Sequence, residues 1–129
     1  MSTTEQQKTS ETTREIVYLT YDKASSSLIS SELEKAGYRT TLTSSIGETI
    51  LCLRQPKFLA LIIGPLVQPK DKALLVSELR RKNSKTKVVF LSRDGTQQAD
   101  DRRLADAVLS VHNGADSLIR GLKKLMIAN

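Results

Sequence analysis

The chain has 129 residues, 39% of them hydrophobic, which suits one small domain built around a single core. Its single cysteine, Cys52, excludes an internal disulfide, and the sequence shows neither a membrane-spanning apolar run nor a signal peptide. The net charge of +6 permits a nucleic-acid or acidic partner without requiring one. We therefore expect a soluble cytoplasmic protein.

The amino-terminal segment, residues 1–14, contains no Val, Ile, Leu, Phe or Tyr. Such a segment cannot bury enough apolar area to offset the entropy lost when it becomes ordered. We therefore predict a flexible polar tail over residues 1–14 and a single domain over residues 15–129.

From there, short apolar or β-branched runs alternate with longer amphipathic stretches. In chain order the pattern predicts strand 16–20, helix 25–36, strand 38–43, helix 45–55, strand 58–63, helix 70–83, strand 87–92, helix 97–105, strand 107–111 and helix 114–127. Strands 58–63 and 87–92 are apolar enough to be buried on both faces, which is typical of central parallel strands. The apolar helix faces are expected to include Leu28, Ile29 and Leu33, then Ile50, Leu51 and Leu53, then Leu74, Leu75 and Leu79.

Strict alternation of five strands and five helices predicts an α/β fold with a parallel sheet covered on both faces. For a domain of this size we expect the flavodoxin-like three-layer arrangement with strand order 2-1-3-4-5. In such folds the reactive site lies at the carboxyl ends of strands 1 and 3.

The residues at the strand ends exclude several chemistries. The loop after the first strand has no glycine, and no glycine-rich phosphate-binding motif is present anywhere in the sequence. Carboxylates at the strand ends are few, and one Cys with one His cannot form a zinc site. Cys52 is flanked by leucines in a helix and is interpreted as a core residue, and His112 as a solvated loop residue. We therefore expect no cofactor, no metal and no catalytic residues.

Five segments carry a resemblance to a known family: Ile16–Leu19, Glu34–Tyr38, Lys57–Ile63, Val88–Ser92 and Leu104–Leu109. Their pattern and spacing resemble the receiver domain of two-component response regulators over residues 15–127. The resemblance implies a receiver-like fold and a place in a phosphorelay.

The phosphorylation chemistry of receivers does not carry over to this sequence. Receivers hold Mg²⁺ with two adjacent acids after the first strand, and Thr20 and Tyr21 stand at those positions. The phosphoacceptor Asp falls on Gly64, and the Lys that contacts the phosphoryl group falls on Val111. Only Ser92 matches, as the switch hydroxyl. The resemblance therefore implies a pseudo-receiver that is not phosphorylated at the usual site.

Three functions remain open at this point. The first is a non-catalytic signalling module that docks on a histidine kinase, a regulator or an output protein. The second is a phosphate-accepting regulator with displaced acids, for which Asp94 and Asp106 are the nearest candidates. The third is a nucleic-acid-associated protein that uses the basic stretch 80–87, although these cations also suit the carboxyl end of a helix. We expect no membrane partner.

In receivers the face built from the fourth helix, fifth strand and fifth helix is the usual dimer and output surface. The corresponding residues carry both signs of charge: Asp100, Asp101, Arg102, Arg103, Arg120, Lys123 and Lys124. Mixed charges suit a weak, salt-sensitive homodimer, and an ordinary solvated surface would have the same composition.

Overall fold

A computed structural model describes residues 14–55, 57–82, 85–92, 99–111 and 115–127. The strands are β1 (Arg14–Leu19), β2 (Tyr38–Thr43), β3 (Phe58–Ile63), β4 (Lys87–Ser92) and β5 (Ala107–Ser110). The helices are α2 (Lys23–Lys35), α3 (Ile46–Leu53), α4 (Pro69–Lys82), α5 (Ala99–Leu104) and α6 (Asp116–Ile127). Residues 1–13 of the predicted tail and the candidate residues Asp94 and His112 lie outside the described residues.

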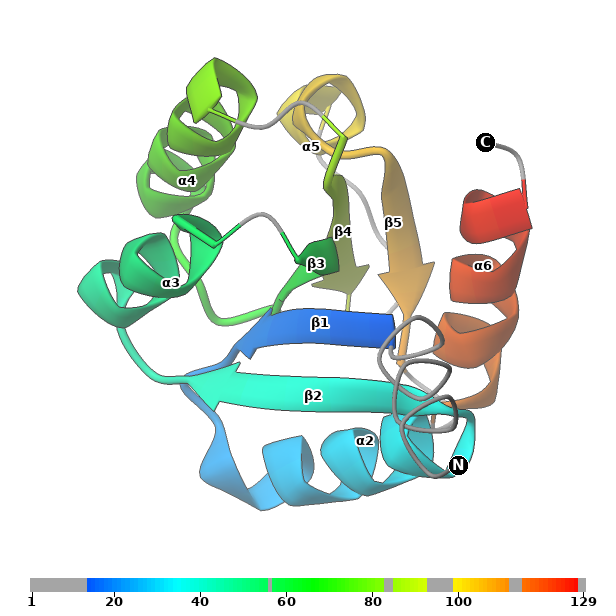
Figure 1. The fold of residues 1–129 in the computed structure, drawn as a ribbon. Helices are drawn as coiled ribbons and strands as arrows, with labels where there is room; N and C mark the ends of the chain where they lie inside the picture. The colour runs from blue at the N-terminus through cyan, green and yellow to red at the C-terminus, as the bar shows by residue number, and fades with distance from the viewer. Residues whose placement is uncertain (1–13, 56, 83–84, 93–98, 112–114, 128–129) are drawn as a thin grey trace, which may run out of the picture.

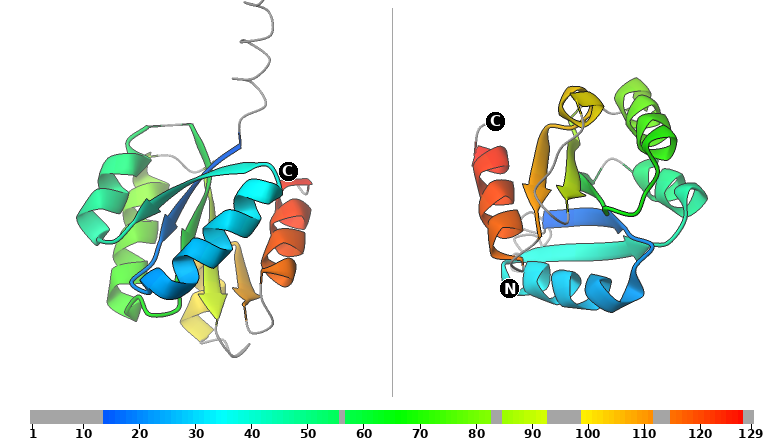
Figure 2. Two further views of the ribbon diagram at one scale, coloured as in Figure 1. Left: turned by 90° about the horizontal axis from the view of Figure 1, so that it is seen from below. Right: turned by 180° about the vertical axis from the view of Figure 1, so that it is seen from behind.

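The five strands form one sheet in the order β2-β1-β3-β4-β5, and every neighbouring pair is parallel. Helices α2 and α6 cover one face of this sheet, whereas α3, α4 and α5 cover the other (Figures 1 and 2). The predicted flavodoxin-like architecture and strand order are confirmed. Within the described ranges, no helix is long and apolar enough to span a membrane.

Alternate residues of each central strand supply the two halves of the core. In β1, Val17 and Leu19 join the cluster beneath α3, α4 and α5, whereas Ile16 and Tyr18 join the cluster beneath α2 and α6. Strand β3 divides its side chains in the same way, but Leu59 near its start is 38% exposed. Burial on both faces explains why the central strands are almost wholly apolar.

Three predicted core leucines are exposed instead. Leu28, Leu51 and Leu74 have exposed fractions of 59%, 59% and 46%. Successive residues of a helix point about 100° apart around its axis, so the residue next to a buried one in the sequence can point toward solvent. Ser26 in α2 and Lys72 in α4 are buried at the positions that complete the helical spacing.

The boundaries of α2 and α3 follow from local chemistry. Gly37 ends α2 with a φ of +100°, a conformation that side chains disfavour, and donates its N–H to the Glu34 carbonyl at 3.0 Å. Ser45 caps α3 because its hydroxyl accepts the Glu48 N–H at 3.1 Å. The Glu48 carboxylate in turn accepts the N–H of Ser44 at 2.8 Å, and this bond lowers the pKa of Glu48. Ser45 is therefore the cap of α3 and not its first helical residue.

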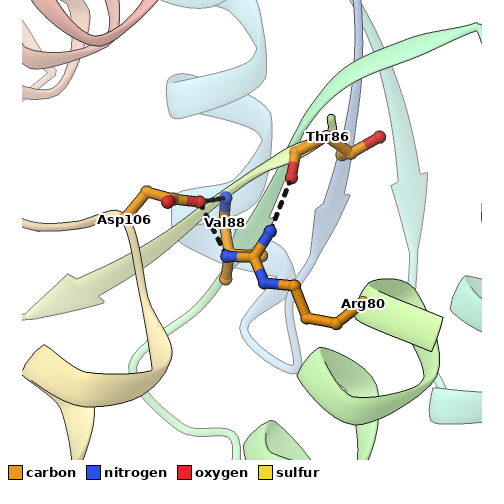
Figure 3. Close-up of polar contacts among 4 residues, drawn as sticks. All are labelled: Arg80, Thr86, Val88 and Asp106. Atoms are coloured by element: carbon orange, nitrogen blue, oxygen red, sulfur yellow. Dashed lines mark hydrogen bonds and ion pairs between the residues drawn. The ribbon is translucent and has the colours of Figure 1, made fainter. Parts of the chain in front are cut away.

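An arginine–aspartate network ties α4 to the start of β4 (Figure 3). The Asp106 carboxylate accepts the N–H of Val88 at 2.7 Å and a guanidinium N–H of Arg80 at 3.0 Å. Arg80 also donates to the Thr86 carbonyl at 3.3 Å. Arg80, the first cation of the basic stretch 80–87, therefore has a structural role.

Two neighbouring arginines offer a matched test of this network. Arg80→Ala should lower the free energy of unfolding by about 1–2 kcal/mol, because it removes hydrogen bonds to a carboxylate and a carbonyl. Arg81→Ala should cost less than about 0.5 kcal/mol, because Arg81 pairs with Glu78 on the exposed surface. Urea unfolding of the two variants measures the difference, and equal losses would contradict the assigned role of Arg80.

Candidate functional site

The carboxyl edge of the sheet brings four of the five receiver-site positions together. Thr20 follows β1 and donates its N–H to the Thr43 carbonyl at 3.1 Å. Gly64 follows β3 and donates to the Leu19 carbonyl at 2.8 Å, which holds the ends of β3 and β1 side by side. Val111 follows β5, and its N–H bonds the carbonyl of Ser92 at the end of β4 at 3.0 Å.

The side chain of Thr20 is engaged in the turn that leads into α2. It is 6% exposed, and its hydroxyl accepts the Asp22 N–H at 3.1 Å and donates to the Asp22 carbonyl at 3.3 Å. The Asp22 carboxylate accepts the Ala24 N–H at 3.1 Å, as expected of a helix cap. Tyr21 points outward and is 41% exposed. Thr20 and Tyr21 therefore bring no negative charge to the edge.

Tyr18 is a polar residue of this edge that sequence reasoning missed. It is 1% exposed, and burial raises the pKa of its phenol. A hydrogen bond with Thr20 opposes this shift in pKa, and the nearby Asp22 charge adds to it. The phenol is therefore a neutral group beneath the turn. Tyr18 lies within the predicted strand 16–20, and nothing in that stretch of sequence indicates its hydrogen bond with Thr20.

Gly64, which the resemblance places at the phosphoacceptor position, lies in a closely packed environment. A Cβ at this residue would lie 3.2 Å from the Leu19 carbonyl oxygen and 3.5 Å and 3.6 Å from the Cα and Cβ of Thr20. That carbonyl also accepts the N–H of Gly64, so it cannot move away without weakening the bond. A side chain at residue 64 would therefore require the Leu19 carbonyl to shift by a few tenths of an ångström.

Ser92 and Val111 complete the edge. Ser92, the predicted switch hydroxyl, is the last residue of β4 and is 8% exposed. Val111 is half-buried and contacts the cluster beneath α2 and α6. Val111 therefore brings an aliphatic side chain to the position for which the resemblance implies a lysine.

In the part of the edge that the structure describes, acidic, His and Cys side chains do not gather. Among the described residues, no group of three or more His, Cys, Asp or Glu could hold a metal ion. Cys52 is half-buried and contacts the cluster beneath α3, α4 and α5, in line with its interpretation as a core residue. Burial raises the pKa of its thiol, which disfavours the reactive thiolate.

One residue of the candidate interaction face, Asp101, is buried, although the sequence predicts it on the surface. Asp101 is 9% exposed, and its carboxylate lies 3.3 Å from the Lys72 ammonium, itself 4.7 Å from the centre of the Phe90 ring. Asp101 therefore joins α5 to α4 and is not available to a partner. The exposed basic residues of the face are Arg102, Arg103, Arg120, Lys123 and Lys124. Asp100 is placed in α5.

No protein-family model and no curated protein matches the chain. Among solved structures, it is similar to the chemotaxis response regulator CheY4 of Vibrio cholerae, with 14% identity, a TM-score of 0.77, and 88% of this chain and 99% of that chain covered. It is also similar to the receiver domain of the Pseudomonas aeruginosa sensor histidine kinase PA1611, solved with magnesium in its active-site cleft, with 18% identity, a TM-score of 0.73, and coverage of 88% and 97%. A third similar structure is the histidine kinase ThkA in complex with the response regulator TrrA, with 18% identity, a TM-score of 0.73, and coverage of 87% and 97%.

These likenesses show the fold. The chain has the CheY-like form of the flavodoxin-like fold, in which response-regulator receiver domains are built.

Two glycines offer a matched test of the packing at the edge. Gly64→Ala should lower the free energy of unfolding by about 1–2 kcal/mol, because the new methyl group crowds the backbone of β1. Gly47→Ala should raise it by about 0.5–1 kcal/mol, because a Cβ at this position in α3 meets no atom within 4 Å. Thermal or urea unfolding of both variants gives the two signs, and a stabilised Gly64→Ala protein would show that the edge has room for a side chain.

Proposed function

We propose that the chain is a non-catalytic, receiver-like signalling module that acts through protein–protein contacts and does not accept phosphate at the usual position. The observation that carries the proposal is Gly64. It offers no nucleophile, and its backbone is hydrogen-bonded to β1 where a side chain would be crowded.

The charges at the carboxyl edge support the same proposal. Phosphoryl transfer needs a cation to neutralise the phosphoryl oxygens, and a hard cation needs several oxygen ligands, usually carboxylates. The similar PA1611 receiver domain holds magnesium in its cleft. In this chain the positions of the acid pair carry the buried hydroxyl of Thr20 and the outward side chain of Tyr21.

The proposed partner is another signalling protein: a histidine kinase, a regulator or an output protein. The similar regulator TrrA, seen in complex with the kinase ThkA, supports this class of partner. The proposal includes the absence of enzymatic activity and a cytoplasmic location, the latter from the single cysteine.

The alternative function, in which a displaced acid accepts phosphate, is less well supported than the proposed one. Asp106 lies at the opposite edge of the sheet, where its carboxylate bonds Arg80 and the Val88 N–H. Asp22 caps α2. Both carboxylates have structural roles that phosphorylation would disrupt.

The phosphorylation test compares this chain with the PA1611 receiver domain under the same conditions. Both proteins are incubated with acetyl phosphate and Mg²⁺, and their intact masses are measured. This chain should show no phosphoryl adduct, because it has no acceptor carboxylate at residue 64 and no acid pair beside it. An Mg²⁺-dependent adduct on this chain would refute the proposal, and its position would identify a displaced acceptor.

The interaction face gives a second test. If the chain associates with itself through α5, β5 and α6, the exposed cations of this face must pair with acids of the second copy other than the buried Asp101. The contact should weaken as salt is added, because salt screens exposed ion pairs, each of which contributes less than about 1 kcal/mol. Sedimentation of the wild type and of Arg102→Glu/Arg103→Glu, at low and high salt, should then show a dimer only for the wild type at low salt. If both proteins remain monomeric at every concentration tried, the homodimer is excluded and the face remains a candidate only for a different protein.

A further inference from the structure

The opposite, amino-terminal edge of the sheet contains an open pocket of about 620 Å³. Strands β3 and β4 begin at this edge, and helices α3 and α4, which run antiparallel to the strands, end there. Four cationic side chains consequently meet around one hollow: Arg54, Lys57, Lys82 and Lys85. We call this hollow the basic pocket.

The charge of the basic pocket is of one sign. Half of the eight described residues that line it are cationic, and none of the eight is acidic. Glu15 lies 3.3 Å from the Lys57 ammonium and offsets part of that charge. Glu78 is close to Lys82 but accepts two hydrogen bonds from Arg81, at 2.8 Å and 2.9 Å. The pocket therefore attracts anions.

Helix ends alone do not explain the basic pocket. Cations near a helix carboxyl end are favourable, and this accounts for Arg54 after α3 and Lys82 at the end of α4. Lys57 and Lys85, however, lie just before strands β3 and β4. The topology thus places cations from two strand starts beside those from two helix ends.

Three apolar residues also line the basic pocket, and we call them its apolar floor. They are Leu53 and Phe58, both mostly buried, and Leu59, which is 38% exposed although it belongs to a central strand. A lining that combines cations with apolar residues fits a ligand that carries both anionic groups and an apolar or planar part. The volume lies within the range typical of small-molecule sites.

We propose that the basic pocket binds a small organic molecule that carries two or more phosphate groups, such as a nucleoside triphosphate. A long nucleic acid fits less well, because it needs cations along an extended path. The neighbouring Arg80 and Arg81 do not extend such a path, since Asp106 and Glu78 pair with them. This site is separate from the receiver-like edge and goes beyond the proposed signalling function.

The experiment titrates the full chain with inorganic tripolyphosphate and, separately, with ATP, and follows binding by calorimetry and amide chemical shifts. Arg54→Glu/Lys82→Glu should weaken both ligands by about tenfold or more, since charge-assisted hydrogen bonds to phosphate are lost. The control Arg120→Glu/Lys123→Glu makes the same change of charge on the exposed surface of α6 and should leave affinity within about twofold. If the charge-reversed pocket variant does not fold, Arg54→Gln/Lys82→Gln serves the same purpose.

A third variant tests the apolar floor. Leu59→Gln should weaken ATP and leave tripolyphosphate unchanged, because only ATP has a planar base to lie against that floor. The proposal is overturned if wild type binds neither ligand, or if the pocket and control variants lose affinity equally. A further contrary result has two parts: a single-stranded RNA displaces ATP, and the affinity for that RNA falls equally in the pocket and control variants. The charge of the whole surface would then account for binding.

Discussion

The parallel direction of all five strands determines where every functional residue lies. Because each strand starts at one edge of the sheet and ends at the other, the loops divide into two sets that never meet. The carboxyl edge collects Thr20, Gly64, Ser92 and Val111. The amino-terminal edge collects the basic pocket and the Arg80–Asp106 network. The topology thus separates the receiver-like edge from the basic pocket.

At the carboxyl edge, the polar side chains after β1 are hydrogen-bonded within their own turn, and the residue after β3 packs closely against β1. Thr20 and Asp22 form the turn and the cap that start α2, and Gly64 allows β3 to approach β1 closely. Among the described residues of this edge, the Asp22 carboxylate is part of the cap of α2, and Tyr18 and Ser92 are buried.

Much of this arrangement follows from local sequence patterns. The bounds predicted for strands 38–43, 58–63 and 87–92 agree with β2, β3 and β4. Apolar runs between polar loops indicate the buried strands β3 and β4, whereas β2 is indicated by its aromatic and β-branched residues. Burial of Lys72 with Asp101 was not predictable, because it depends on how α4 and α5 lie against Phe90. Convergence of cations from residues 54–57 and 82–85 likewise depends on the topology. The sequence showed only the second half of that cluster, as a basic stretch.

The central claim is that the carboxyl edge of a receiver-like fold lacks the charge to hold a divalent cation. Titration of the ¹⁵N-labelled chain with Mg²⁺, followed through the amide shifts of Thr20, Tyr21 and Gly64, tests it most directly. The account predicts that these amides show no saturable shift, because the buried hydroxyl of Thr20 is bonded to its own turn and Gly64 has no side chain. Saturable shifts confined to these residues would contradict it and would establish a working metal site.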